Sequence, residues 1–162
     1  MRSVFGFVCI VCVAAILFSA CSATGPGSTA FPNVVEITGC HERDGSDPDA
    51  VYSCIEYDYA DGVLSILHTN TCFNCCPVNW GGFVTIEDRV ITIEEVEGQG
   101  DCDCRCLFDI EYRIENLEPG EYDLVVQELY PAIDAVSFNV GFDFTQPDSG
   151  EICLERSGYP WE

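Results

Sequence analysis

Apolar and polar residues alternate with a period of two along most of this chain, and this pattern constrains the fold more than any other feature. In the segment 108–114, apolar residues occupy every second position and charged residues lie between them. Side chains of a β-strand point to opposite faces at this period, so such a segment buries one face and exposes the other. No window shows helical periodicity with capping residues. The pattern therefore predicts antiparallel sheets with one solvated face.

Nine segments show this alternation or an equivalent apolar run, and turn-forming residues separate them. The predicted strands are 33–38, 51–59, 63–68, 83–87, 90–96, 105–114, 122–130, 135–144 and 151–155. Short amphipathic strands in this number bury their apolar faces best when two sheets pack face to face. The sequence predicts an all-β domain over residues 31–162, an antiparallel β-sandwich of eight or nine strands.

The segment 114–126, which contains a Leu-x-Pro-Gly turn followed by Tyr122, resembles a strand–turn–strand of immunoglobulin-like and fibronectin-like sandwiches. In those sandwiches the tyrosine forms a tyrosine corner. The resemblance implies an immunoglobulin-like sandwich in which the hydroxyl of Tyr122 binds the backbone upstream. It concerns the fold and implies no activity.

The N-terminus has the form of an export signal. A short start containing Arg2 precedes the apolar run 4–18, which is shorter than the roughly 20 residues of a bilayer-spanning helix. The run ends in Leu-Phe-Ser-Ala-Cys21, which resembles the lipobox of bacterial lipoproteins. The resemblance implies cleavage after Ala20 and a diacylglycerol on Cys21. Ordinary secretion with cleavage near Ala23, or an uncleaved anchor, are the alternatives.

This interpretation divides the chain into a signal peptide (1–20), a lipidated cysteine with a flexible tether (21–30) and the β-sandwich domain (31–162). It predicts a cell-envelope location, at the outer membrane or the cell surface. The whole chain has 28 acidic and 6 basic residues and a formal charge of −22. Such a charge repels phosphate groups, so the sequence excludes nucleic acid as a partner. We expect a membrane contact through the lipid alone.

Nine of the twelve cysteines belong to the predicted domain, and export would place them where disulfides persist. Six of them form two clusters: Cys72, Cys75 and Cys76, and Cys102, Cys104 and Cys106. In an extended strand the second cluster would form a row on one face, with neighbours about 6.5–7 Å apart at Cα. That distance disfavours bonds within the row. We therefore expect the three cysteines of one cluster to face the three cysteines of the other.

Two kinds of chemistry fit these clusters. One is a set of disulfides, up to four bridges with one cysteine left over and no connectivity assigned. The other is a thiolate metal site, in which His68 and the six sulfurs would bind zinc or copper. A mixed or redox-active site is a third possibility. The spacing NCCP…CxCxC resembles that of uncharacterised cysteine-rich secreted or lipid-anchored proteins, which implies no activity.

Two other groups of residues, an acidic turn and the two tryptophans, could bind a ligand or could have a purely structural role. Asp44, Asp47 and Asp49 could form a weak calcium site, but a solvated acidic turn has the same composition. Trp80 and Trp161 could form an aromatic platform for a sugar or peptide, whereas core packing is the more frequent role of tryptophan.

The sequence gives little support for an enzyme. The chain has two histidines, His41 and His68, and lacks a Gly-x-Ser-x-Gly motif, and we expect neither histidine to lie near a plausible nucleophile. A Cys72–His68 pair would lie among thiols that oxidise it. We predict a non-enzymatic structural or interaction module without a cofactor, with a protein or glycan partner. A zinc- or copper-binding envelope protein is the alternative.

Overall fold

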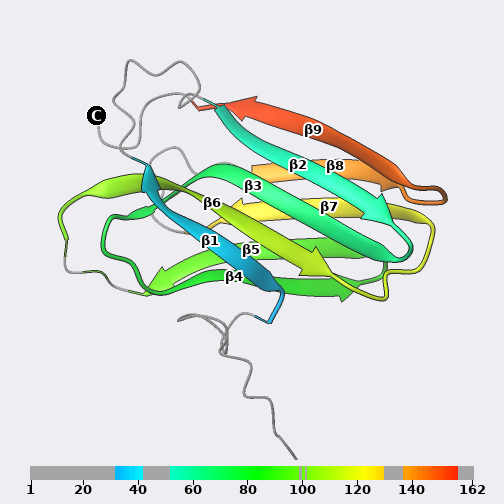
Figure 1. Cartoon of the computed structure of the whole chain (residues 1–162), viewed down its shortest axis with the longest axis horizontal. Helices are drawn as coiled ribbons and strands as arrows, with labels where there is room; N and C mark the ends of the chain where they lie inside the picture. The colour runs from blue at the N-terminus through cyan, green and yellow to red at the C-terminus, as the bar shows by residue number, and fades with distance from the viewer. Residues whose placement is uncertain (1–31, 42–51, 99, 101, 130–136, 157–162) are drawn as a thin grey trace, which may run out of the picture.

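The computed structural model describes residues 32–41, 52–98, 100, 102–129 and 137–156, which form two packed β-sheets (Figure 1). Every element in these ranges is a strand, so the prediction of an all-β sandwich is confirmed. The strands are β1 (Val34–His41), β2 (Tyr52–Ala60), β3 (Val63–Asn74), β4 (Val78–Glu87), β5 (Val90–Gly98), β6 (Arg105–Ile114), β7 (Glu121–Glu128), β8 (Ser137–Asp143) and β9 (Asp148–Glu155).

One sheet has five strands in the order β1-β6-β3-β2-β9, and the other has four in the order β4-β5-β7-β8. Figure 1 shows the two sheets as separate layers. Neighbouring strands are antiparallel except β5 and β7, which are parallel. After β5 the chain passes to the five-stranded sheet, where it forms β6. It then returns to the four-stranded sheet as β7, which runs in the same direction as β5. The second sheet is therefore mixed, not purely antiparallel as the sequence predicted.

The core lies between the sheets and consists of the inward-facing positions of each strand. In β7, for example, Tyr122, Leu124 and Val126 are buried, while the residues between them are exposed or half-buried. Burial of such side chains stabilises each by about 1.5–3 kcal/mol relative to exposure. The largest side chains with less than 2% exposure are Tyr112, Phe73, Phe138, Phe144, Ile55, Leu64, Ile66, Ile91, Ile93, Leu107, Ile110 and Ile114.

The region 69–82 differs from the sequence prediction, which placed a long loop there. β3 continues to Asn74 and β4 begins at Val78, so that the turn between them is short. A bulge lies between His68 and Thr71, where Asn70 adopts a φ of 59°. Residues 70–74 are all buried. Because both faces of this segment are covered, the two-residue alternation disappears there and gives no strand signal.

The turn before β7 has the contact that the tyrosine-corner resemblance implies. Tyr122 Oη donates a hydrogen bond to Glu118 O at 2.9 Å. The backbone N–H of Phe144 donates to Gly120 O at 2.8 Å, which joins the same turn to the end of β8. These bonds position the Pro119–Gly120 turn against the neighbouring connection.

The described residues include no helix long and apolar enough to cross a membrane. The predicted signal peptide, Cys21 and the tether lie outside the described residues. The acidic turn with Asp44, Asp47 and Asp49 also lies outside them, as does Trp161.

Candidate functional site

Two disulfides join the two cysteine clusters. Cys75 and Cys76 form the tight turn after β3, and they pair with Cys104 and Cys102, respectively. The backbone N–H of Cys75 also donates to Cys104 O at 3.2 Å. The segment that precedes β6 is therefore held covalently to the β3–β4 turn, across sequence separations of 29 and 26 residues.

The third expected pair between the clusters does not form. Cys72 is opposite Leu107 in the β3–β6 ladder, whereas Cys106 is opposite Phe73. Cys106 forms a disulfide with Cys40 of β1 instead. Among the described cysteines Cys72 alone is a free thiol, and it is buried. The bulge in β3 shifts the register of this strand, so the sequence spacing of the clusters did not predict which residues meet.

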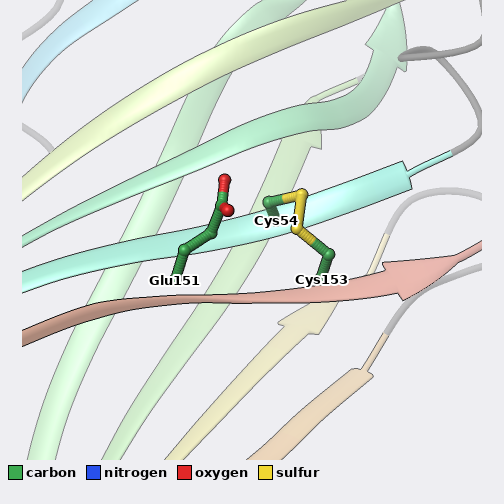
Figure 2. A group of neighbouring side chains, drawn as sticks. All are labelled: Cys54, Glu151 and Cys153. Atoms are coloured by element: carbon green, nitrogen blue, oxygen red, sulfur yellow. A yellow bond between two sulfur atoms is a disulfide. The ribbon is translucent and has the colours of Figure 1, made fainter.

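A fourth disulfide, Cys54–Cys153, joins β2 to the edge strand β9 (Figure 2). The two residues are direct partners in the ladder, and their Cα atoms are 4.0 Å apart. Glu151 projects from β9 on the same side as Cys153. The three side chains lie close enough to enclose an ion. The two sulfurs are bonded to each other, however, so they are not thiolate ligands.

The predicted thiolate metal site does not assemble in the described part of the chain. Five of its six cysteines are in disulfides, and the remaining one, Cys72, keeps its proton because burial raises the pKa of its thiol to about 12. A metal site needs deprotonated sulfur. His68, the proposed imidazole ligand, binds other groups, as described below. The residues therefore do not fit the zinc or copper alternative.

His68 lies in a group of polar side chains that are buried between the two sheets. This group is here called the buried polar cluster. It contains Ser53, His68, Thr71, Glu95, Tyr112, Glu128 and Arg156, each of them less than 9% exposed. Buried polar groups are stable only where they bind one another. The contacts within the cluster meet this condition.

Ser53, His68 and Glu95 form a continuous hydrogen-bonded chain. Ser53 Oγ lies 2.7 Å from His68 Nε2, and His68 Nδ1 donates to Glu95 Oε1 at 2.7 Å. This connectivity is that of a serine–histidine–acid triad. The expectation that neither histidine lies near a plausible nucleophile is therefore wrong for His68. The serine is 15 residues away in sequence, and the pairing of β2 with β3 brings it close.

Two further hydroxyl groups hold the Glu95 carboxylate in place. Thr71 Oγ1 donates to Glu95 Oε2 at 2.7 Å, and Tyr112 Oη donates to Glu95 Oε1 at 2.8 Å. The Tyr112 ring can take this position because it lies against Gly82 of β4, where a Cβ atom would overlap the ring. Both carboxylate oxygens are thus occupied by donors from the five-stranded sheet.

These contacts stabilise the charged forms of His68 and Glu95. Burial alone lowers the pKa of His68, but the charge and hydrogen bond of Glu95 outweigh it and raise that pKa above 6.5. Burial alone raises the pKa of Glu95, but His68, Thr71 and Tyr112 outweigh it and hold that pKa below 4.5. Burial and the adjacent Glu95 raise the pKa of Tyr112 well above 10.0. Each shift favours the charged form of its group, so the two side chains form an ion pair when His68 is protonated.

Glu128 and Arg156 form a second ion pair in the cluster. Arg156 Nη1 donates to Glu128 Oε2 at 3.1 Å, and Arg156 Nη2 donates to Glu128 Oε1 and to Asn70 O. The two side chains are 2% or less exposed. The ligand atoms of His68, Glu95 and Glu128 lie within 4.8 Å of one another, which is close enough for a metal ion. Each of them already binds a protein donor or acceptor, so a metal would have to displace these contacts.

No substrate path to Ser53 is visible among the described residues. Ser53 and His68 are both 0% exposed. Three surface pockets are lined by described residues alone, and neither Ser53 nor His68 lines any of these three. The hydrogen-bonded chain from Ser53 to Glu95 therefore lies in the core of the described part of the domain.

The remaining sequence candidate, Trp80, belongs to the core as well. It is half-buried and packs on Phe73 and Phe108, with ring centroids 5.2 and 4.6 Å away. The aromatic platform that the sequence suggested is thus not formed by this residue. Aromatic packing of this kind contributes about 0.5–1.5 kcal/mol per pair beyond the buried area.

The alternation of the strands contained a signal for the buried polar cluster. His68 continues the inward-facing series of Leu64 and Ile66, and Glu95 continues that of Ile91 and Ile93. Ser53 and Glu128 extend the inward-facing positions of β2 and β7 in the same way. A polar residue in the inward phase of a strand predicts a buried polar group.

The domain is therefore a disulfide-bonded β-sandwich with a charged cluster in its core. No protein-family model matches the chain, and no curated protein or solved structure matches it either.

Proposed function

We propose that this chain is a lipid-anchored module of the cell envelope, with a structural or binding role and no enzymatic activity. The observation that carries the proposal is the set of four disulfides in the described residues. Disulfides persist in exported proteins and are rare in the reducing cytosol. The N-terminal segment supplies the other support, because its apolar run ends in a lipobox-like sequence at Cys21.

A non-enzymatic role agrees with the chemistry of the buried polar cluster. Ser53 has the hydrogen-bond partners of a nucleophile, but it is fully buried and lines none of the surface pockets described above. The free thiol of Cys72 is buried too and keeps its proton. The proposal includes no metal, because the sulfurs that would bind it are in disulfides. We expect the partner to be a protein or a glycan.

Lipid attachment is tested by comparing the wild-type chain with Cys21→Ala in a bacterial host that processes lipoproteins. We expect the wild type in the membrane fraction, with an intact mass that shows loss of residues 1–20 and addition of a diacylglycerol. Cys21→Ala should lose the lipid mass. An unprocessed wild-type product in the cytosol, with its thiols reduced, would overturn the proposal.

The absence of serine-hydrolase activity is tested with a fluorophosphonate probe, which labels activated serines. We expect no labelling of the folded wild-type chain, because the probe cannot reach a buried hydroxyl. Labelling that disappears in Ser53→Ala and persists in Ser65→Ala, a serine on the opposite face of the five-stranded sheet, would show an accessible nucleophile. That result would replace the proposed role with a hydrolytic one.

A further inference from the structure

The charged groups of the buried polar cluster are divided between the two sheets by sign. His68 lies on β3, and Arg156 directly follows β9, so both cationic groups belong to the five-stranded sheet. Glu95 lies on β5 and Glu128 on β7, so both anionic groups belong to the four-stranded sheet. The attraction between opposite charges therefore acts across the interface of the sandwich.

The cluster is neutral only when His68 carries a proton. His68 and Arg156 then balance Glu95 and Glu128, and none of the four is more than 6% exposed. A buried charge without a counter-charge is strongly unfavourable because the interior screens it poorly. Removal of one proton from His68 leaves two anionic groups facing one cationic group.

We propose that the buried polar cluster is a proton-dependent clasp, in which protonated His68 holds the two sheets together and its deprotonation weakens their packing. The proposal concerns the stability of the domain and does not depend on lipid attachment or on a partner. It assigns a regulatory property to the cluster, namely a sandwich that loosens as the surrounding pH rises.

The hydrogen bonds of the cluster suit both protonation states. Neutral His68 can still donate from Nδ1 to Glu95, and its Nε2 can accept the proton of the Ser53 hydroxyl. The contacts of Thr71 and Tyr112 with Glu95 do not involve the titrating proton. Deprotonation therefore changes the charge balance without breaking the network. The expected response is a graded loss of stability.

The other titratable groups around His68 do not change their protonation state near neutral pH. Tyr112 on β6 and Cys72 on β3 stay protonated, since the pKa of each is well above its usual value. Glu95 stays ionised, because its pKa lies below 4.5. Arg156 is always charged. On β8 the neighbour is Phe138, whose ring meets the imidazole edge-on at 5.5 Å and does not titrate.

The composition of the chain makes this effect easy to measure. It contains no lysine and two histidines, and its 28 carboxyl groups titrate mostly at acidic pH. Because the pKa of folded His68 is raised above 6.5, its contribution to stability is complete below that pH. The contribution is lost as the pH rises through the pKa of the folded state.

The test is urea unfolding of the full chain in detergent micelles, with disulfides intact, between about pH 6 and about pH 8.5. The variants are His68→Gln and the matched control His41→Gln. Relative to His68→Gln, the folding equilibrium constant of the wild type should fall with rising pH, at most about tenfold per pH unit. His41→Gln should keep the wild-type pH dependence. Parallel curves for the wild type and His68→Gln would overturn the proposal.

A second measurement serves if His68→Gln does not fold. The imidazole nitrogen shifts of the wild type report the charge of each histidine, and comparison with His41→Gln assigns the two signals. We expect the His68 ring to remain protonated above pH 6.5, the usual pKa of histidine. A His68 ring that is already neutral at that pH would contradict the proposal independently of any variant.

Discussion

The two ends of the sandwich are stabilised in different ways. At the end where β2 meets β3 through a tight turn, the core is apolar and aromatic: Tyr59 stacks on Phe144 at 4.6 Å, and Leu64 is 1% exposed. Towards the other end, where β3 finishes, the core contains the buried polar cluster beside the aromatic group of Phe73, Trp80 and Phe108. The disulfides lie at this second end, close to the first residues of β2 and β6 and the last residues of β1 and β9.

This difference shows how a small domain can accommodate charges in its core. Apolar packing stabilises in proportion to the area buried, whereas a buried ion pair gives little net stabilisation after its desolvation. Disulfides stabilise independently of core polarity, because they restrict the unfolded chain. The covalent links are found at the end of the sandwich whose core also contains charged groups.

Arg156→Ala should have the largest effect, at the polar end. It leaves Glu128 buried without its guanidinium partner, and loss of one member of a buried pair lowers the free energy of unfolding by about 3–5 kcal/mol. Urea unfolding of the oxidised protein measures the loss. Arg113→Ala is the matched control, because Arg113 and its partner Glu115 are 49% and 61% exposed and such pairs contribute at most about 1 kcal/mol. Equal losses would show that the buried pair of Glu128 and Arg156 is no more important for stability than an exposed ion pair.

Leu64→Ala tests the apolar end. The side chain is almost fully buried, and its truncation leaves a cavity, so we expect a loss of about 2–5 kcal/mol in the free energy of unfolding. Leu154→Ala, on the edge strand β9 and 37% exposed, should cost about 0.5 kcal/mol. Unlike the variants at His68, Leu64→Ala should lower stability equally at all pH values in the neutral range. A pH-dependent loss would argue against the separation of the two ends.

The double variant Cys75→Ser and Cys104→Ser tests the covalent contribution at the polar end. Removal of this bridge should lower the free energy of unfolding by about 2–4 kcal/mol, given its separation of 29 residues. Cys72→Ala is the control, because it removes a buried thiol but no disulfide, and it should cost about 1 kcal/mol. An unchanged melting temperature in the double variant would mean that the loop before β6 does not depend on this bridge.

Tyr122→Phe should have the smallest effect. It removes the hydroxyl that donates to Glu118 O and keeps the ring in the core, so the loss should be about 1 kcal/mol. Thermal unfolding should show a decrease of roughly 4 °C. Tyr52→Phe, at a tyrosine that is 43% exposed, should leave the melting temperature unchanged. Equal shifts in the two variants would show that the hydrogen bond of the Tyr122 hydroxyl does not stabilise the apolar end.

Much of the fold could be predicted because alternation is a local property. Each of the nine predicted segments corresponds to a strand in the structure, and β6 has the predicted bounds 105–114. The segment 69–74 was missed because a bulge and burial on both faces remove the alternation there. The parallel pairing of β5 with β7 was missed as well, since pairing depends on the path of the chain between the strands.

The candidate site was predicted less well, for a related reason. The cysteine spacing indicated that the 72–76 and 102–106 regions meet, and two bridges join them. It could not show that Cys106 pairs with Cys40, because that bond depends on the order of β1 and β6 in the sheet. The partner of His68 was missed entirely, since Glu95 belongs to the opposite sheet.

The amino-acid order alone determined where the strands lie and which side chains face inward, including His68, Glu95 and Glu128, because both follow from a two-residue period within each strand. Only the tertiary structure decided that these inward-facing groups meet with opposite signs across the interface. That outcome depends on strand order, register and the stacking of the sheets, which arise from contacts between residues far apart in the chain.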